Sequence, residues 1–239
     1  MAELNGMGGL ARAVASAAAL GIMLWCGPVP NVPAAPRPTP PAVSIPAPMS
    51  VPRNPICVDA PETPMTPEIR SEQRVWVRRT IAASRDRDIA AIVIDKAGYA
   101  LHLYELGERT RSYPIQLGLD PVNDKVMEKD CRTPEGIYQI VGKLRPPQTT
   151  YRHALLLDYP NFHDYAEFIT MRYRTLQIPL DAKIGDNIRI HGGGVDARGD
   201  AEEGWNWTKG CVALSDESMH DLAGRVLVGT PVAIVRELR

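Results

Sequence analysis

The sequence predicts a mainly β fold with a few helices, in the α+β class, and two patterns lead to this prediction. Short apolar or alternating stretches recur between turn-forming residues from residue 88 onward, and stretches of this kind favour β-strands. Helix signals occur at residues 66–84 and 217–225. Short strands joined by long loops, with few helices among them, predict a domain built on a mixed sheet.

A hairpin is the clearest predicted strand pair. Residues 91–94 form an apolar run, residues 96–98 supply a turn, and residues 99–104 alternate between apolar and polar side chains. Two such stretches around a short turn favour antiparallel pairing. Further strands are expected at residues 111–117, 136–141, 154–157, 187–191 and 230–235.

The first predicted helix has a recognisable start. Thr66 can act as its N-cap, Pro67 suits the first turn, and Glu68 lies near the positive end of the helix dipole. We therefore assign residues 66–87 to a helix that leads into the folded domain, which we place at residues 88–239.

The N-terminal part has a different composition. Residues 11–25 are apolar apart from Arg12 and Ser16, and this run is short for a membrane span of about 20 residues but suits a secretory signal. We assign residues 1–27 to a signal peptide or an uncleaved N-terminal anchor. Residues 28–65 are crowded with Pro and Ala, which favours an extended linker. The prediction is an exported protein of the periplasm or cell envelope.

The charge balance argues against one class of partner. The 239 residues carry 27 Lys and Arg against 28 Asp and Glu. There is no basic arm and no basic stripe interleaved with aromatic residues. The sequence therefore gives no support to nucleic-acid binding, and it leaves the oligomeric state open.

A histidine and a cysteine stand out because glycines surround both. His191 precedes Gly192 and two further glycines, which are expected to end its strand, and Cys211 follows Gly210. The missing Cβ of Gly210 would leave room for a substrate backbone. A thiol becomes a strong nucleophile only when it is deprotonated, and a nearby imidazole can take the proton. We therefore predict Cys211 as nucleophile and His191 as base, with backbone amides around Gly210 and Cys211 as an oxyanion hole.

These stretches resemble the L,D-transpeptidase catalytic domain (YkuD) family. The family pattern of HG, a gap and S/T-x-GC matches residues 191–192 and 208–211, and its TPxG and YPN pieces match residues 133–136 and 159–161. The ending at residues 210–214 is similar to that of a branch that carries GC-[IV]-A-[LM]. The resemblance thus extends over most of the predicted domain.

The resemblance implies a cysteine acyltransferase. Its members attack peptidoglycan stem peptides through a thioester, which would form on Cys211 with His191 as base. It also implies susceptibility to carbapenem-type β-lactams, and neither a cofactor nor a metal. The residues that it places in the oxyanion or substrate loop are Gly210, Thr208, Gly192 and Lys209.

Three other functions are compatible with the same residues. This chain has Lys209 and Ala213 where many family members carry His and Arg, so a hydrolase of peptidoglycan-linked peptides is the first alternative. The second is a non-catalytic peptidoglycan-binding module. The third is a structural domain in which Cys211 is a small buried apolar residue.

Several neighbours of the predicted pair have two interpretations. Trp205 and Trp207 either cover the sheet edge or form a wall of the substrate groove. Arg189 and Lys209 are each either solvated or in contact with a substrate carboxylate. A zinc site that includes Asp196 or Asp200 would lack the paired CxxC or HExxH spacing, so we predict no metal.

The four cysteines fall in different parts of the chain. Cys26 lies at the end of the signal segment, where lipid modification is an alternative, although Trp25 is a poor neighbour for it. In an oxidising compartment Cys57 and Cys131 could pair, which would leave Cys211 as the reactive thiol. The histidines other than the predicted base are expected to be structural or exposed, and these are His102, His153, His163 and His220.

Overall fold

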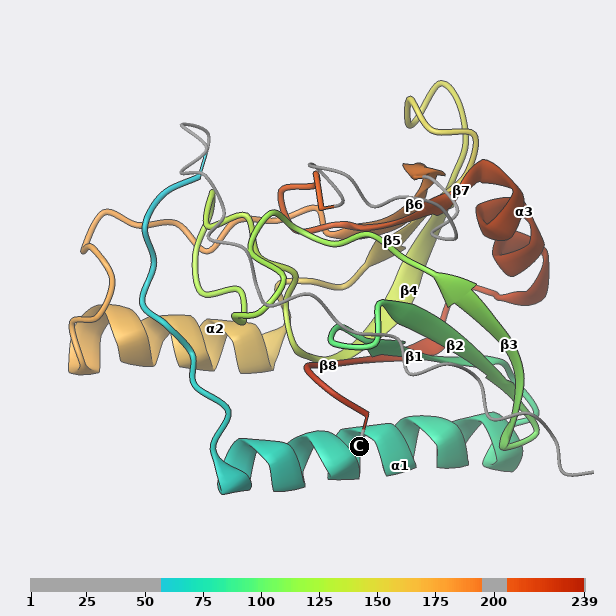
Figure 1. Cartoon of the computed structure of the whole chain (residues 1–239), viewed down its shortest axis with the longest axis horizontal. Helices are drawn as coiled ribbons and strands as arrows, with labels where there is room; N and C mark the ends of the chain where they lie inside the picture. The colour runs from blue at the N-terminus through green and yellow to red at the C-terminus, as the bar shows by residue number, and fades with distance from the viewer. Residues whose placement is uncertain (1–56, 195–205, 239) are drawn as a thin grey trace, which may run out of the picture. The chain divides into compact units, whose positions relative to one another are not determined.

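The computed structural model describes residues 57–194 and 206–238, which form one eight-stranded mixed sheet with three α-helices and a short π-helix. The strand order is β3-β2-β1-β8-β4-β5-β6-β7 (Figure 1). The strands are β1 (Ala91–Asp95), β2 (Ala100–Glu105), β3 (Glu108–Pro114), β4 (Gly136–Leu144), β5 (Ala154–Leu157), β6 (Arg189–Gly194), β7 (Val212–Ser215) and β8 (Pro231–Val235). The helices are α1 (Pro67–Asp86), α2 (Phe162–Ile169), the π-helix η1 (Thr170–Arg174) and α3 (Asp216–Arg225). The predicted α+β class is confirmed.

Helix α1 begins where its sequence signals predict. The Thr66 side chain accepts a hydrogen bond of 3.3 Å from the Ile69 N–H and caps the helix. In Figure 1, α1 runs along the sheet at β1 and β8, and both strands contact it. Its half-buried Trp76, Val77 and Ile81 pack against a cluster of buried side chains, which are Ala91, Val93, Tyr104 and Val235. None of the helices in the described part of the chain is both long and apolar enough to span a membrane.

The main core lies on the other side of the sheet from the α1 cluster. Ile92 and Ile94 of the central strand β1 are inaccessible to solvent, as expected for a continuous apolar run covered on both faces. Met219 and Leu222 of α3 join the same core. Helix α3 packs on β6 and β7 and thereby supports the strands that carry the candidate site.

The strand predictions hold best where local patterns are strong. The hairpin of β1 and β2 is antiparallel, with Ala91 opposite Tyr104, and β5 has the predicted bounds. Strand β3 ends at Pro114, earlier than predicted, because Gln116 instead exchanges backbone hydrogen bonds with Ala213. Strand β4 continues to Leu144.

The prediction that the glycines end strand β6 is wrong. The strand continues through Gly194, which lies opposite Ser215 of β7. The glycines serve close approach rather than termination. A Cβ on Gly192 would lie 2.2 Å from Asp216 Oδ1, and one on Gly194 would lie 2.8 Å from the Leu214 carbonyl oxygen.

The disulfide between Cys57 and Cys131 is present, with the two Cα atoms 5.6 Å apart. This confirms the predicted pairing. Cys211 is the free cysteine among the described residues. Cys26 and the predicted signal segment lie outside the described residues, as does the linker up to residue 56.

Candidate active site

Two parallel strands bring the predicted pair together. Strand β6 lies beside the edge strand β7, with His191 opposite Ala213. Alternate residues of a strand face the same side of a sheet. Arg189 precedes His191 by two positions in β6, so these two side chains belong to one face of the sheet, and Cys211 lies directly before β7.

The imidazole of His191 is held in a defined orientation. Its Nδ1 lies 2.6 Å from the Gly192 carbonyl oxygen, which can only accept, so Nδ1 carries the proton and Nε2 is left as a proton acceptor. The ring is buried and stacks on Tyr151, with centroids 3.8 Å apart and an interplanar angle of 12°. The edge contact with Trp207, at 5.6 Å between centroids, holds a second side of the ring.

Burial sets the protonation of both groups. Desolvation lowers the pKa of His191, although the hydrogen bond to Gly192 opposes this. Desolvation raises the pKa of Cys211, against the backbone N–H and the guanidinium of Arg189, which lower it. The resting pair near neutral pH is therefore a thiol and a neutral imidazole.

The thiol is not yet engaged with the base. Cys211 Sγ lies 3.8 Å from the Asn187 carbonyl oxygen, and no hydrogen bond joins it to His191 within the described ranges. A thiol and a neutral imidazole with a free acceptor nitrogen are the two groups that nucleophilic catalysis by cysteine requires.

A single hydroxyl organises the loop before the cysteine. Thr208 Oγ1 donates to the Cys211 carbonyl oxygen at 2.7 Å and accepts from the Gly210 N–H at 3.1 Å. The Gly210 N–H therefore donates within the loop in this structure, and the predicted oxyanion hole of backbone amides around Gly210 and Cys211 stays a prediction. The Gly192 N–H is likewise used, by the His153 carbonyl at 3.2 Å. Lys209 is exposed.

The backbone of Gly210 leaves no space for a side chain. Its φ is +131°, and a Cβ there would lie 2.5 Å from the Arg132 carbonyl oxygen. The expected reason for this glycine was room for substrate. The structure shows instead that the loop packs against the segment next to Cys131, which the disulfide ties to Cys57.

Substitution of Thr208 by valine is expected to destabilise the fold by about 1–3 kcal/mol, because it leaves the buried Gly210 N–H without its acceptor. Urea unfolding of the full chain measures this loss. The same variant should also slow alkylation or acylation of Cys211, since its loop is no longer fixed. Thr208→Ser keeps the hydroxyl and serves as the control; equal losses in both variants would contradict the role of the hydroxyl.

Sequence reasoning missed two residues of the site. Tyr151 lies in the loop between β4 and β5, 40 positions before the histidine on which it stacks, and the charge of Cys211 contributes to a raised pKa of its hydroxyl. Asn187 precedes β6 and contacts the sulfur through its carbonyl group. Neither carries a local signal, because each depends on which strands are neighbours. Trp205, Asp196 and Asp200 lie outside the described residues, and within those residues no three His, Cys, Asp or Glu side chains are grouped to hold a metal.

Trp207 lies beside the candidate base. Its exposed fraction is 40%, its indole N–H donates to Gln116 Oε1 at 3.0 Å, and its edge faces His191. The indole is therefore fixed beside the candidate base and partly open to solvent, and its two interpretations, cover of the sheet edge or wall of a substrate groove, stay predictions.

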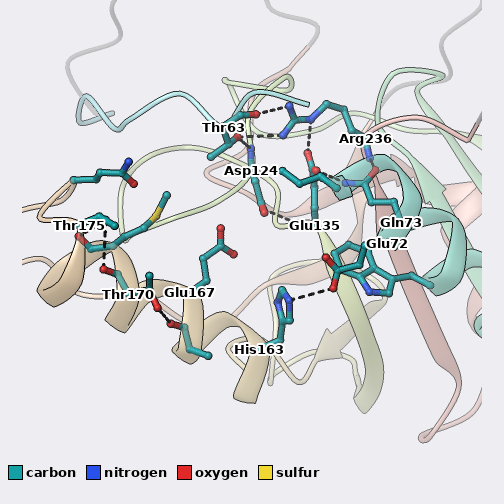
Figure 2. A pocket seen from close by; sticks show the side chains of 15 residues that line it. Thr63, Glu72, Gln73, Asp124, Glu135, His163, Glu167, Thr170, Thr175 and Arg236 are labelled. Carbon is teal, nitrogen blue, oxygen red and sulfur yellow. Dashed lines mark hydrogen bonds and ion pairs between the residues drawn. The ribbon is translucent and has the colours of Figure 1, made fainter. Parts of the chain in front are cut away.

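A hollow lies between α1 and α2 (Figure 2). Its volume is about 490 Å³, and neither His191 nor Cys211 lines it. Burial and the neighbouring Glu135 and Glu167 raise the pKa of Asp124 in its wall. Glu72, Asp124, Glu135 and Glu167 all line the hollow, which is separate from the residues of the candidate active site.

The family of the chain follows from its sequence match. The model of the L,D-transpeptidase catalytic domain (YkuD) matches residues 89–234. The chain therefore belongs to this family, and the resemblance is confirmed. Because the family is one of enzymes, the matched residues form an enzyme-family domain. No curated protein matches the sequence.

Solved structures with a related fold come from several bacteria. Bd1075 from Bdellovibrio bacteriovorus is 23% identical over 63% of this chain and 49% of its own, with a TM-score of 0.45. The helical cell shape determining protein Pgp2 from Campylobacter jejuni is 21% identical over 70% of this chain and 57% of its own, with a TM-score of 0.46. An L,D-transpeptidase from Mycobacterium smegmatis is 16% identical over 61% and 58%, with a TM-score of 0.39. The chain spans only part of the length of each.

Proposed function

We propose that this protein is a peptidoglycan L,D-transpeptidase-like cysteine acyltransferase that acts on stem peptides. His191 Nε2 takes the proton of Cys211, and the sulfur attacks the carbonyl carbon of a donor peptide bond. The bond to nitrogen breaks, the leaving amine takes the proton from the imidazolium, and a thioester remains on Cys211. No cofactor or metal takes part in this scheme.

The second half of the reaction regenerates the thiol. An amine of another stem peptide attacks the thioester and loses a proton to His191 Nε2. A new amide forms, the carbon–sulfur bond breaks, and the imidazolium passes that proton to the sulfur, which leaves as a thiol. If water attacks in place of the amine, the product is a carboxylic acid, and the same residues form a hydrolase. The balance between the two depends on how well the bound acceptor excludes water.

One observation carries the proposal. The hydrogen bond of His191 Nδ1 to the Gly192 carbonyl fixes the tautomer that a base requires, and the free thiol of Cys211 lies directly before the strand that pairs with the strand of His191. A backbone carbonyl thus takes the orienting role that a carboxylate has in many related sites. Membership of the family supports the choice of peptidoglycan as substrate.

The proposal extends to the location and inhibition of the protein. The apolar segment within residues 1–27 supports export to the periplasm or cell envelope. The disulfide between Cys57 and Cys131 supports an oxidising compartment. We further propose that carbapenem-type β-lactams acylate Cys211, since they present a strained amide to the same nucleophile.

Intact mass spectrometry tests the proposal. The full chain is incubated with muropeptides that carry a tetrapeptide stem, alongside Cys211→Ala. We expect a covalent adduct on the wild type alone, with an increase in mass that equals the acyl part of the donor, because only Cys211 supplies the nucleophile. Cys211→Ser is the matched control, since its hydroxyl is far less acidic than the thiol.

The products distinguish the candidate functions. Cross-linked dimers together with the adduct support the transpeptidase, whereas shortened monomers together with the adduct support the hydrolase. Bound but unchanged muropeptides, with no adduct on either protein, would overturn the enzyme and favour a peptidoglycan-binding module. A Cys211 that also resists thiol reagents would indicate a structural domain.

A further inference from the structure

A guanidinium group stands beside the candidate nucleophile. Arg189 Nε donates to Asn187 Oδ1 at 2.9 Å, and the sulfur of Cys211 lies 3.8 Å from the carbonyl oxygen of the same Asn187. The cation and the thiol are thus anchored to one residue. Strand alternation places Arg189 and His191 on the same face of β6.

The side chain of Arg189 bonds to a neutral amide, and within the described residues it forms no ion pair. Two other half-buried arginines do pair with carboxylates: Arg225 with Asp221 and Arg236 with Glu135. Arg172, also half-buried, contacts the Leu180 carbonyl and two aromatic rings instead. A guanidinium has five donors in a planar fork that suits a carboxylate, so Arg189 keeps most of its binding capacity available at the site.

The charge of Arg189 reaches every reactive group of the site. The guanidinium lowers the pKa of both His191 and Cys211, and it lowers that of the Tyr151 hydroxyl against the effect of burial. A positive potential therefore extends over the place where an electrophile must bind. An anionic group of a substrate would gain most from this potential close to the thiol.

We infer that Arg189 forms a carboxylate-binding subsite, which receives a free carboxylate of the acyl donor near the bond that Cys211 attacks. Asn187 holds the guanidinium through Nε and leaves its terminal nitrogens for a two-point contact with the carboxylate. The inference rests on the proposed function for the identity of the donor. It predicts selectivity for stem peptides with a free acid over stem peptides whose acid is amidated.

Two small alkylating reagents test the subsite without any assumption about the reaction. Iodoacetate and iodoacetamide both react when the Cys211 thiolate displaces iodide from their CH₂ carbon. Iodoacetate carries a carboxylate where iodoacetamide carries an amide. Because both need the same thiolate, the ratio of their rates is independent of the thiol pKa. The full chain is alkylated, and modification is read on the Cys211 peptide by mass spectrometry, relative to a free cysteine peptide.

The ratio of the iodoacetate rate to the iodoacetamide rate should be roughly tenfold higher for Cys211 in the wild type than for the free cysteine peptide. This preference should fall with added salt, because the contact is ionic. Arg189→Gln should remove this preference, and Arg189→Lys should retain part of it. Arg85→Gln is the matched control, since Arg85 is an exposed residue of α1 whose side chain pairs with Asp86. A wild-type ratio equal to that of the free peptide, or an unchanged ratio in Arg189→Gln, overturns the inference.

The muropeptide assay separates this inference from the proposed function. With free-acid and amidated tetrapeptide stems as donors, Arg189→Gln should lose the preference for the free acid, measured as the ratio of kcat/KM for the two donors, because any change in the pKa of Cys211 or His191 affects both donors alike. If alkylation shows the preference but no acyl-enzyme forms with either donor, the carboxylate subsite stands and the acyltransferase fails. If acyl-enzyme forms equally from both donors in the wild type, the proposed function stands and the subsite fails.

Discussion

Replacement of His191 by asparagine is expected to slow acylation of Cys211 by about 10²–10⁴-fold, the usual contribution of a positioned general base. Asparagine retains an N–H donor for the Gly192 carbonyl, which His191 Nδ1 contacts at 2.6 Å, but it has no group that can accept the thiol proton at neutral pH. Stopped-flow mass spectrometry or single-turnover assays with a tetrapeptide donor measure the loss.

The acylation rates of the wild type and of His191→Asn should depend on pH in different ways. Burial lowers the pKa of His191, so the wild type should keep its base unprotonated below the ordinary histidine range and lose acylation only as the pH falls through that lowered value. Burial raises the pKa of Cys211, so the asparagine variant should regain rate only at high pH, where the thiolate forms without help.

His163→Asn is the matched control for this substitution. His163 is exposed on α2, its Nε2 lies 3.9 Å from Glu72 Oε1, and it lines the hollow between α1 and α2. Its replacement should leave the rate and the pH profile unchanged. A normal acylation rate in His191→Asn, or the same acidic limb in the profile of that variant, would show that another group accepts the proton.

Local sequence pattern was sufficient to single out His191 and Cys211 as candidates, because glycines lie beside both. The parallel pairing of β6 with β7 then places His191 opposite Ala213, two positions after the cysteine. The contacts of Tyr151 and Asn187 could not be predicted, because they depend on strand order and on a loop between β4 and β5. The occupied Gly210 N–H depends on the rotamer of Thr208, which a sequence pattern does not report.

The same division applies to the fold. Strands β1 and β2 carry strong local signals and were predicted with their pairing. Helix α2 was missed although Asn161 and Asp164 form a capping box at its start, a signal that can be read from the sequence. Strand β7 has four residues and alternates weakly, so its composition alone does not predict a strand. Its pairing with β6 stabilises the strand conformation instead.

Lys96 shows how tertiary structure overrides a local interpretation. The sequence places it in the turn of the first hairpin, yet its exposed fraction is 1%. Its Nζ donates to the Asn123 carbonyl at 2.8 Å, the Thr133 carbonyl at 3.0 Å and Glu135 Oε1 at 2.8 Å. The lysine thus joins the β1–β2 turn to the loop before β4, and every proton of the ammonium group has an acceptor.

Glu135 connects the same network to both ends of the domain. It also accepts from Gln73 of α1 at 2.6 Å and from Arg236 beyond β8 at 2.9 Å, and Figure 2 shows these groups around the carboxylate. Two cations therefore face one buried carboxylate. The segment that precedes Glu135 includes Arg132, whose carbonyl oxygen lies against Gly210, so this network also supports the loop of the candidate nucleophile.

Substitution of Lys96 by methionine is expected to destabilise the protein by about 3–5 kcal/mol, the cost of removing one partner from a buried ion pair. The change leaves the carbonyls of Asn123 and Thr133 without a buried donor, although Arg236 still faces Glu135. Urea unfolding of the full chain, with the disulfide intact, measures the loss. Lys183→Met is the matched control, since Lys183 is exposed, and it should change stability by no more than about 0.5 kcal/mol. A loss below about 1 kcal/mol for Lys96→Met would mean that the network relaxes around an apolar side chain, as some buried ion pairs do.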